Sequence, residues 1–303
     1  MKTFILVNWI LLSLSNLPQF VSAQKDADGW TTVWWDPMAI LFHLPESPFG
    51  FWNVIKTTTT PNEGTNEKQY YTGDKKNLNM HSVFLDDNGN GELRLIPIKD
   101  ENGWTSARLE SKDSIACPDG KMLRLEASIR VPNADSAKQA GFWPAFWAMG
   151  ESYKKGIVWP MCGEWDVMET VQGNGYALGT LHAGVNGERK SFPMKPNEER
   201  QKEFNNNDVI VWGIELNRGP SDWREQSFSW FKNSEKWQEV KGSDINDENI
   251  WKQLTQQAYF AILNVAVGHN IGGEHNPDDQ TASGFENGAA MIVNYVKFKI
   301  KDA

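Results

Sequence analysis

The feature that most constrains the fold is an alternation of apolar and polar side chains with a period of two residues. In the segment 123–131, five apolar residues alternate with four polar ones, and Pro132 follows directly. Successive side chains of a strand point to opposite faces, so this pattern predicts a β-strand with one buried face. Similar patterns predict further strands at 92–98, 142–149, 164–171, 177–182, 208–217, 227–232, 259–267 and 290–300.

Helical periodicity is nearly absent from the sequence. The one good helix candidate is the segment 246–258, which Asp247 and Glu248 open. The segments 57–74 and 185–207 are expected to be long loops. Many strands with almost no helix predict an all-β protein, either a sandwich or a jelly roll.

The N-terminal segment has the organisation of a secretory signal peptide. Lys2 supplies a positive charge, an apolar run covers 4–14, and a small-x-small sequence ends at Ala23. The apolar run is shorter than the roughly 20 residues that span a bilayer. A buried strand or a membrane anchor is the alternative interpretation. We expect cleavage after Ala23, which leaves 24–303 as one domain of a secreted, extracellular protein.

Two features of the composition bear on function. The formal net charge is −9 at pH 7, and an acidic surface argues against nucleic acid or an anionic membrane as the partner. The net charge is compatible with both neutral and basic substrates. The chain also contains 15 Trp and 15 Phe, which indicates a large aromatic core, a surface that stacks on sugars, or both.

Two cysteines, Cys117 and Cys162, occur in the sequence. An even number of cysteines in an oxidising compartment favours a disulfide between them. Two separate buried thiols are the alternative.

The segment with the clearest chemistry contains three carboxylates in the spacing E-x-D-x-x-E. On a strand Glu164 and Asp166 share one face, and one extra residue in a β-bulge brings Glu169 onto the same face. Negative charges so close together raise the pKa of at least one of the three carboxyl groups. Such an arrangement costs stability, so it indicates a functional role. Retaining glycosidases need such a pair, with carboxyl groups roughly 5–5.5 Å apart. A solvated acidic strand face or a metal site has the same spacing.

The surrounding motifs resemble those of glycoside hydrolase family 16, the laminarinase-like group. The matching segments are collinear: GFWPAFWA at 141–148, WP at 159–160, GEWDVME at 163–169, GTLH at 179–182, LNVAVG at 263–268 and NYV at 294–296. The resemblance implies a concanavalin A-like β-jelly-roll sandwich with a concave substrate cleft. It is nearest to a fungal-type subgroup that includes endo-β-1,3-glucanases and endo-β-1,3-galactanases.

The resemblance also implies roles for individual residues. Glu164 would be the nucleophile, Glu169 the general acid and then base, and Asp166 a carboxylate that supports both. The residues expected to bind the substrate are Trp147, Trp159, His182, Arg108 and Trp143. Three of these residues have an alternative role. Trp143 could belong to the core, His182 could be a buried core histidine, and Arg108 could form a surface salt bridge.

Two positions depart from the family pattern. Ile271 stands where many members have a tryptophan that stacks on sugar, and Asn294 replaces an aspartate that binds calcium in some members. No metal ion and no other cofactor is therefore expected. The expected activity is endo-acting, retaining hydrolysis of a β-1,3-linked glucan or galactan by a monomer. A lectin of the same fold and a transglycosylase that uses the same residues are the alternatives.

Overall fold

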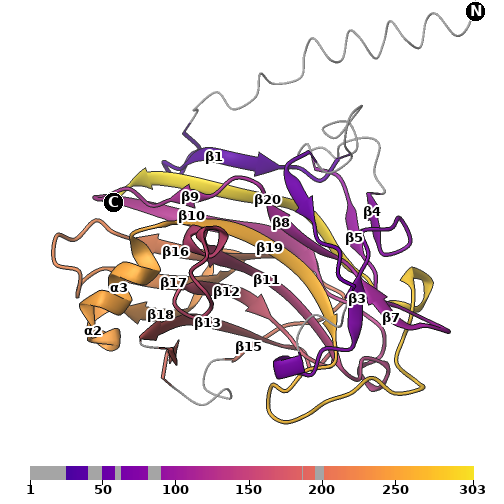
Figure 1. Cartoon of the computed structure of the whole chain (residues 1–303). Helices are drawn as coiled ribbons and strands as arrows, with labels where there is room; N and C mark the ends of the chain where they lie inside the picture. The colour runs from indigo at the N-terminus through magenta and orange to yellow at the C-terminus, as the bar shows by residue number, and fades with distance from the viewer. Residues whose placement is uncertain (1–24, 40–49, 59–62, 81–89, 186, 195–200) are drawn as a thin grey trace, which may run out of the picture.

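The computed structural model describes residues 25–39, 50–58, 63–80, 90–185, 187–194 and 201–303. The predicted signal peptide, 1–23, lies outside these residues. Two large sheets pack face to face (Figure 1), and the strands described within each of them pair antiparallel. Within the described ranges, no helix has the length and apolar character needed to cross a membrane.

The first large sheet has eight strands. It contains, in spatial order, β18 (Glu235–Lys241), β17 (Ser227–Lys232), β16 (Ile210–Asn217), β10 (Lys121–Arg130), β20 (Met291–Asp302), β5 (Leu93–Leu95) and β4 (Leu78–Met80), and β1 (Thr31–Asp36) also pairs with β20. The run predicted from period-two alternation is β10, at the centre of this sheet.

The second large sheet has nine strands. It contains β14 (Glu188–Phe192), β13 (Tyr176–Val185), β12 (Glu164–Glu169), β11 (Phe142–Gly150), β19 (Ala258–Val267), β8 (Arg108–Ser111) and β2 (Trp52–Val54), with β15 (Gln201–Glu203) beside β13 and β9 (Ile115–Ala116) beside β19. A small sheet holds β3 (Gln69–Tyr71), β7 (Gly103–Ser106) and β6 (Ile98–Asp100).

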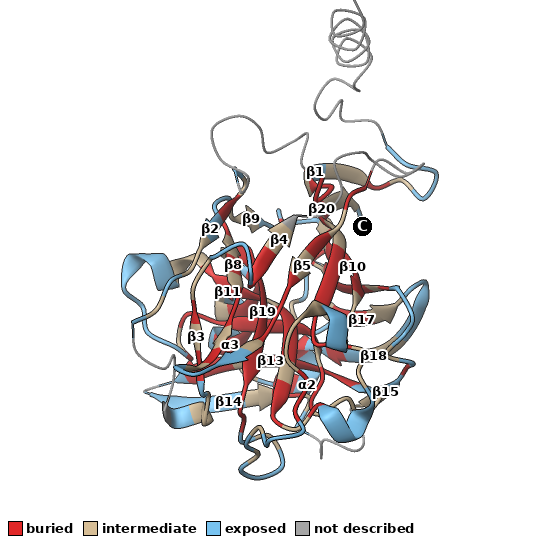
Figure 2. Ribbon diagram, turned by 90° about the vertical axis from the view of Figure 1, so that its right-hand side faces the viewer, coloured by how far each residue is buried: buried red, intermediate tan, exposed pale blue. Residues whose placement is uncertain are grey.

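The main core lies between the two large sheets. Leu125 and Phe298 from the eight-stranded sheet and Phe146 and Leu263 from the nine-stranded sheet belong to one buried cluster. Figure 2 shows the buried residues concentrated in the strands and the exposed residues in the connections. Aromatic residues fill much of this core, and Trp165 stacks on Tyr259 with ring centroids 3.8 Å apart.

Two short helices lie at one end of the sandwich. The helix α3 (Glu248–Thr255) begins where the sequence predicts, because the Asp247 side chain accepts hydrogen bonds from the backbone N–H groups of Asn249 and Ile250. It ends before the predicted Ala258, which already belongs to β19. The helix α2 (Gly242–Ile245) precedes it and was not predicted.

The two segments expected to be loops contain strands. β3 lies within 57–74, and β14 and β15 lie within 185–207. β14 was missed because its composition is that of an edge strand with exposed charge, whereas β3 has no charged residue and is only three residues long. Glu188, Arg189 and Lys190 of β14 are all exposed.

The predicted disulfide is wrong: Cys117 and Cys162 are both free and buried. Cys117 belongs to the main core, whereas Cys162 belongs to a separate cluster with Met149, Phe260 and Ile262. Burial raises the pKa of Cys117 to about 12 and that of Cys162 to about 11. Both side chains are therefore unreactive thiols at neutral pH.

Candidate active site

The three carboxylates of β12 share one face because the strand contains a bulge. Asp166 pairs with Thr180 and Glu169 pairs with Leu178, so three steps on β12 match two steps on β13. The same extra residue appears in the pairing with β11. Trp165, Val167 and Met168 enter the core, and the carboxylates project from the opposite face. The bulge predicted from the E-x-D-x-x-E spacing is confirmed.

Strand register places partner side chains in rows across this outer face. Met149, Glu164 and His182 form one row, and Trp147, Asp166 and Thr180 form the next. The third row runs from Arg108 through Asn264 and Ala145 to Glu169. Residues far apart in the sequence therefore surround the carboxylates.

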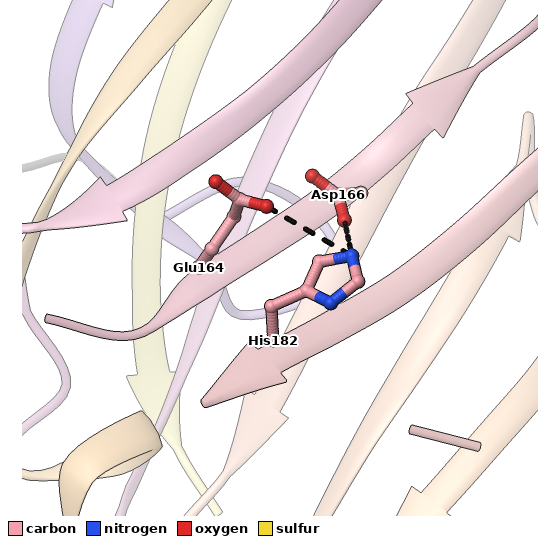
Figure 3. A group of neighbouring side chains, drawn as sticks. All are labelled: Glu164, Asp166 and His182. Atoms are coloured by element: carbon pink, nitrogen blue, oxygen red, sulfur yellow. Dashed lines mark ion pairs between the residues drawn. The ribbon is translucent and has the colours of Figure 1, made fainter. Parts of the chain in front are cut away.

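His182 lies between two of the carboxylates (Figure 3). Its Nε2 atom is 3.2 Å from Oδ2 of Asp166 and 3.9 Å from Oε1 of Glu164. On the other side of the ring, the Ser191 hydroxyl is 2.8 Å from Nδ1. Ser191 pairs directly with His182 across β13 and β14, so it fixes the orientation of the imidazole.

The Glu164 carboxyl holds its proton more tightly than an ordinary glutamate. Burial raises its pKa well above the usual value, and the negative charges of Asp166 and Glu169 raise it further. Electrostatic interactions with His182 and Arg108 oppose this rise. Burial and neighbouring carboxylates are the two effects expected to tune a catalytic acid pair.

Glu169 is held by an indole. The Nε1–H group of Trp143 donates a hydrogen bond to Oε1 of Glu169 over 2.9 Å. Trp143 in turn contacts the edge of His269, with ring centroids 6.3 Å apart. Trp143 is therefore not a core residue, and it positions the carboxylate that stands at the bulge.

Trp147 and Arg108 form a second group beside the carboxylates. The Trp147 Nε1–H group donates to Oδ1 of Asn264 over 2.7 Å, and Tyr71 lies 3.3 Å from the Asn264 amide nitrogen. The Arg108 guanidinium lies 4.8 Å from the Trp147 ring centroid. It also donates to Glu110 over 2.7 Å, so the salt bridge foreseen as the alternative role is present as well.

Trp159 flanks the site from the loop between β11 and β12. Its ring centroid is 6.0 Å from that of His182, and its side chain is 40% exposed. Arg189 of β14 lies 5.9 Å from the same indole. All five predicted substrate-binding residues thus lie around the carboxylate face.

A tryptophan beneath the site supports the bulge. Trp230 of β17 donates its Nε1–H group to the backbone carbonyl of Asp166 over 2.8 Å. A Cβ atom at Gly179 would lie 2.5 Å from the Trp230 ring, so only glycine leaves room for this indole. Trp230, Ser191 and Asn264 were not singled out from the sequence. Asn264 could have been found from the sequence, because it is a polar residue in an otherwise apolar strand. Nothing in the sequence pattern distinguishes Trp230 from a core tryptophan.

Glu164, Asp166 and His182 also have the ligand types of a metal site, and their ligand atoms lie within 4.8 Å of one another. However, the Asp166 carboxylate and the imidazole already contact each other, so an ion would have to displace that contact. Asn294 likewise uses its amide, which donates to the Gly91 carbonyl over 2.9 Å. The geometry fits an acid pair with a supporting carboxylate better than a metal centre.

Comparison with known proteins identifies the family. Residues 62–242 match a family model described as XgeA-like, catalytic GH16 domain. The endo-1,3-β-glucanase from Streptomyces sioyaensis is 26% identical with a TM-score of 0.72, and the match covers 93% of this chain and 100% of that chain. The endo-β-1,3-glucanase from Pyrococcus furiosus is 24% identical (TM-score 0.60, coverage 91% and 97%).

The laminarinase catalytic domain from Thermotoga maritima has the same fold at 23% identity, with a TM-score of 0.61 and coverage of 91% and 99%. No curated protein sequence matches the chain significantly. The family match covers more than half of the chain, and the two packed sheets agree with it. The chain therefore belongs to glycoside hydrolase family 16 and is a glycoside hydrolase with a β-jelly-roll fold.

Proposed function

We propose that this hydrolase is a secreted, endo-acting, retaining enzyme that cleaves a β-1,3-linked glucan or galactan. The observation that carries the proposal is the bulge in β12, which brings Glu164, Asp166 and Glu169 onto one face. A retaining mechanism requires two carboxyl groups roughly 5–5.5 Å apart that flank one glycosidic bond, and a shared strand face brings two glutamates close together. The likeness to the Streptomyces endo-1,3-β-glucanase makes β-1,3-glucan the first substrate to test.

Glu164 is the proposed nucleophile. Its carboxylate attacks the anomeric carbon, and the bond to the leaving sugar breaks as the glycosyl–enzyme ester forms. Glu164 must be ionised for this attack, and its electrostatic interactions with His182 and Arg108 favour the ionised form. Asp166 holds the imidazole in place through its contact with Nε2.

Glu169 is the proposed acid and base. In the first step it donates a proton to the leaving oxygen, and in the second it removes a proton from the water that hydrolyses the ester. The Trp143 N–H group occupies Oε1 of Glu169, so the transferable proton belongs on the other oxygen. Trp147 and Trp159 offer indole faces for sugar rings on either side of the carboxylates.

Two variants test the assignment. Glu164→Gln is expected to abolish hydrolysis of laminarin while the protein remains folded. Glu169→Ala is expected to keep activity on substrates with a good leaving group, and azide is expected to rescue it with a β-glycosyl azide as product. An α-azide would reverse the two roles. Glu235→Gln, a change at an exposed residue of β18, serves as the control.

The substrate is tested with a purified panel of laminarin, mixed-linkage glucan, β-1,3-galactan, xyloglucan and agarose. Endo-action predicts a ladder of oligosaccharides and a rapid fall in viscosity. Binding without turnover on every member would support a lectin, and enlarged products with an added acceptor sugar would support a transglycosylase. Secretion is tested by N-terminal sequencing of the exported protein, which is expected to begin at Gln24.

A further inference from the structure

A polar hollow lies apart from the carboxylates, at the end of the sandwich where the chain passes between the two sheets. Its volume is about 830 Å³, and the segments 133–138 and 279–290 supply most of its lining. Arg130 of β10 also lines it. Because Arg130 pairs with Ile292 and Ile292 pairs with Arg94, the two arginines share one row across β10, β20 and β5.

This row belongs to the outer face of the eight-stranded sheet. Leu93, Leu95 and Ile129, the neighbours of the two arginines, point into the core. The catalytic carboxylates instead project from the outer face of the nine-stranded sheet. The hollow and the carboxylates are therefore separate sites.

Phe285 gives the hollow an aromatic platform. The guanidinium carbon of Arg94 lies 3.6 Å from the Phe285 ring centroid, and Glu92 holds Arg94 through a contact of 2.6 Å. Phe285 belongs to none of the hydrophobic clusters of the described residues. A ring that is supported on one face by a cation, rather than buried in the core, suits stacking on the C–H-rich face of a sugar.

Arg130 has one guanidinium nitrogen, the buried Nη1 atom, without a hydrogen-bond partner among the described residues. A buried donor without an acceptor costs roughly 1–3 kcal/mol. Arg130 lines the hollow, so turning its guanidinium toward a ligand oxygen there would relieve this cost. The other charged groups that line the hollow are of both signs, including Lys138, Asp135 and Glu286. A strongly anionic ligand would meet these carboxylates, whereas sugar hydroxyls both donate and accept hydrogen bonds.

We propose that this hollow, the Phe285 hollow, is a second carbohydrate-binding site that holds a neutral segment of the polysaccharide substrate away from the carboxylates. The proposal rests on the proposed function, because it takes the same polymer as its ligand. A long chain can reach both sites, whereas a short oligosaccharide occupies one at a time. The Phe285 hollow thus keeps the enzyme on the polymer between cleavages.

The test measures binding rather than turnover. Glu164→Gln serves as the parent, and its retention is measured in native gels that contain laminarin. Adding Phe285→Ala is expected to weaken the apparent affinity by about three- to tenfold, the scale of one aromatic contact. The matched control is Phe231→Ala: Arg124 lies 4.8 Å from the Phe231 ring centroid, and Phe231 does not line the hollow. Equal retention of the two double variants would overturn the proposal.

A second variant separates binding from folding. Arg130→Met removes the buried donor, so the melting temperature is expected to stay the same or rise while retention by laminarin falls. A purely structural role for Arg130 would lower the melting temperature and leave retention unchanged. Calorimetric titration of the parent with laminarin oligosaccharides is expected to show two sites, and one site after Phe285→Ala. A single site in the parent would also overturn the proposal.

The two proposals fail in different ways. If the wild type hydrolyses no polysaccharide of the panel, the proposed function fails, but the gels still report binding by the Phe285 hollow. If hydrolysis depends on Glu164 and retention is unaffected by Phe285→Ala, only the second site fails.

Discussion

At the scale of single residues, the site depends on charges placed close together. The pKa of Glu164 is raised by burial, then by Asp166 and Glu169, and His182 and Arg108 limit the rise. A nucleophile with a raised pKa loses its ionised form as the pH falls through that raised value. The acid limb of kcat/KM is therefore expected at a higher pH than the ordinary glutamate value of about 4.3.

Asp166→Asn tests the origin of this limb. Removing the neighbouring negative charge lowers the pKa of Glu164, so the acid limb of kcat/KM is expected to move to lower pH. The value of kcat is expected to fall by about tenfold or more, because the imidazole loses its carboxylate partner. The measurement is a pH–rate profile on laminarin for both proteins. An acid limb that does not move would show that the Asp166 charge does not act on Glu164.

At the scale of elements, the bulge in β12 depends on the opposite sheet. The Trp230 indole crosses the core to the carbonyl of Asp166, in the space left by Gly179. Trp230→Phe leaves this carbonyl without its donor, and the expected cost is about 1–3 kcal/mol of unfolding free energy. Because Asp166 lies at the bulge, kcat is expected to fall as well.

The matched control for this change is Trp212→Phe on the neighbouring strand β16. Trp212 is fully buried, and among the described residues its Nε1 atom has no hydrogen-bond partner. The two substitutions remove the same atoms, but only Trp230→Phe removes a hydrogen bond. Denaturant unfolding and kcat are measured for both. Equal losses of unfolding free energy and kcat in the two variants would show that the effect comes from the lost side-chain volume rather than from the lost hydrogen bond to the bulge.

The loop between β19 and β20 carries the departure at Ile271. The Ile271 N–H group donates to Nδ1 of His269, whose ring contacts Trp143, so the loop lies beside the carboxylate face. Ile271→Trp is expected to lower KM for laminarin by a few-fold to about tenfold, equivalent to ~1 kcal/mol. Disaccharide-sized substrates are expected to be unaffected. If initial rates on laminarin do not change, residue 271 does not contact the substrate.

The sequence predicts which segments are strands better than it predicts which side chains from different strands contact each other. Period-two alternation locates most long strands and, with the E-x-D-x-x-E spacing, predicts the bulge and the face that carries Glu164 and Glu169. It cannot show that Ser191 lies beside His182 or that Trp230 lies under Asp166, because these contacts depend on strand pairing and sheet packing. The disulfide prediction is wrong for the same reason, because the number of cysteines does not determine which hydrophobic cluster each side chain joins.

At the scale of the whole molecule, the site is expected to cost stability. A carboxyl whose pKa is raised on folding binds more protons in the folded state than in the unfolded state. It therefore stabilises the folded state at a pH below its pKa in the unfolded state. This stabilisation declines as the pH rises from that pKa through the higher pKa of the folded state. At pH values above the unfolded pKa, the buried Glu164 is therefore destabilising, and its proposed role as the nucleophile gives a functional reason for this cost.

Glu164→Gln should consequently raise the melting temperature at pH 7, by about 2–4 °C if ~1 kcal/mol is recovered in a domain of this size. The difference from the wild type is expected to shrink as the pH falls toward and below the ordinary glutamate pKa of about 4.3, because Glu164 then becomes neutral in both the folded and the unfolded state. The matched control is Glu126→Gln on β10, a buried carboxylate that contacts Arg124 at 2.6 Å and Lys299 at 3.6 Å. Breaking that paired arrangement should lower the melting temperature. Thermal unfolding of the three proteins from pH 4 to pH 8 measures both effects. A melting temperature of Glu164→Gln below that of the wild type across this range would show that Glu164 contributes to the fold rather than being tolerated by it.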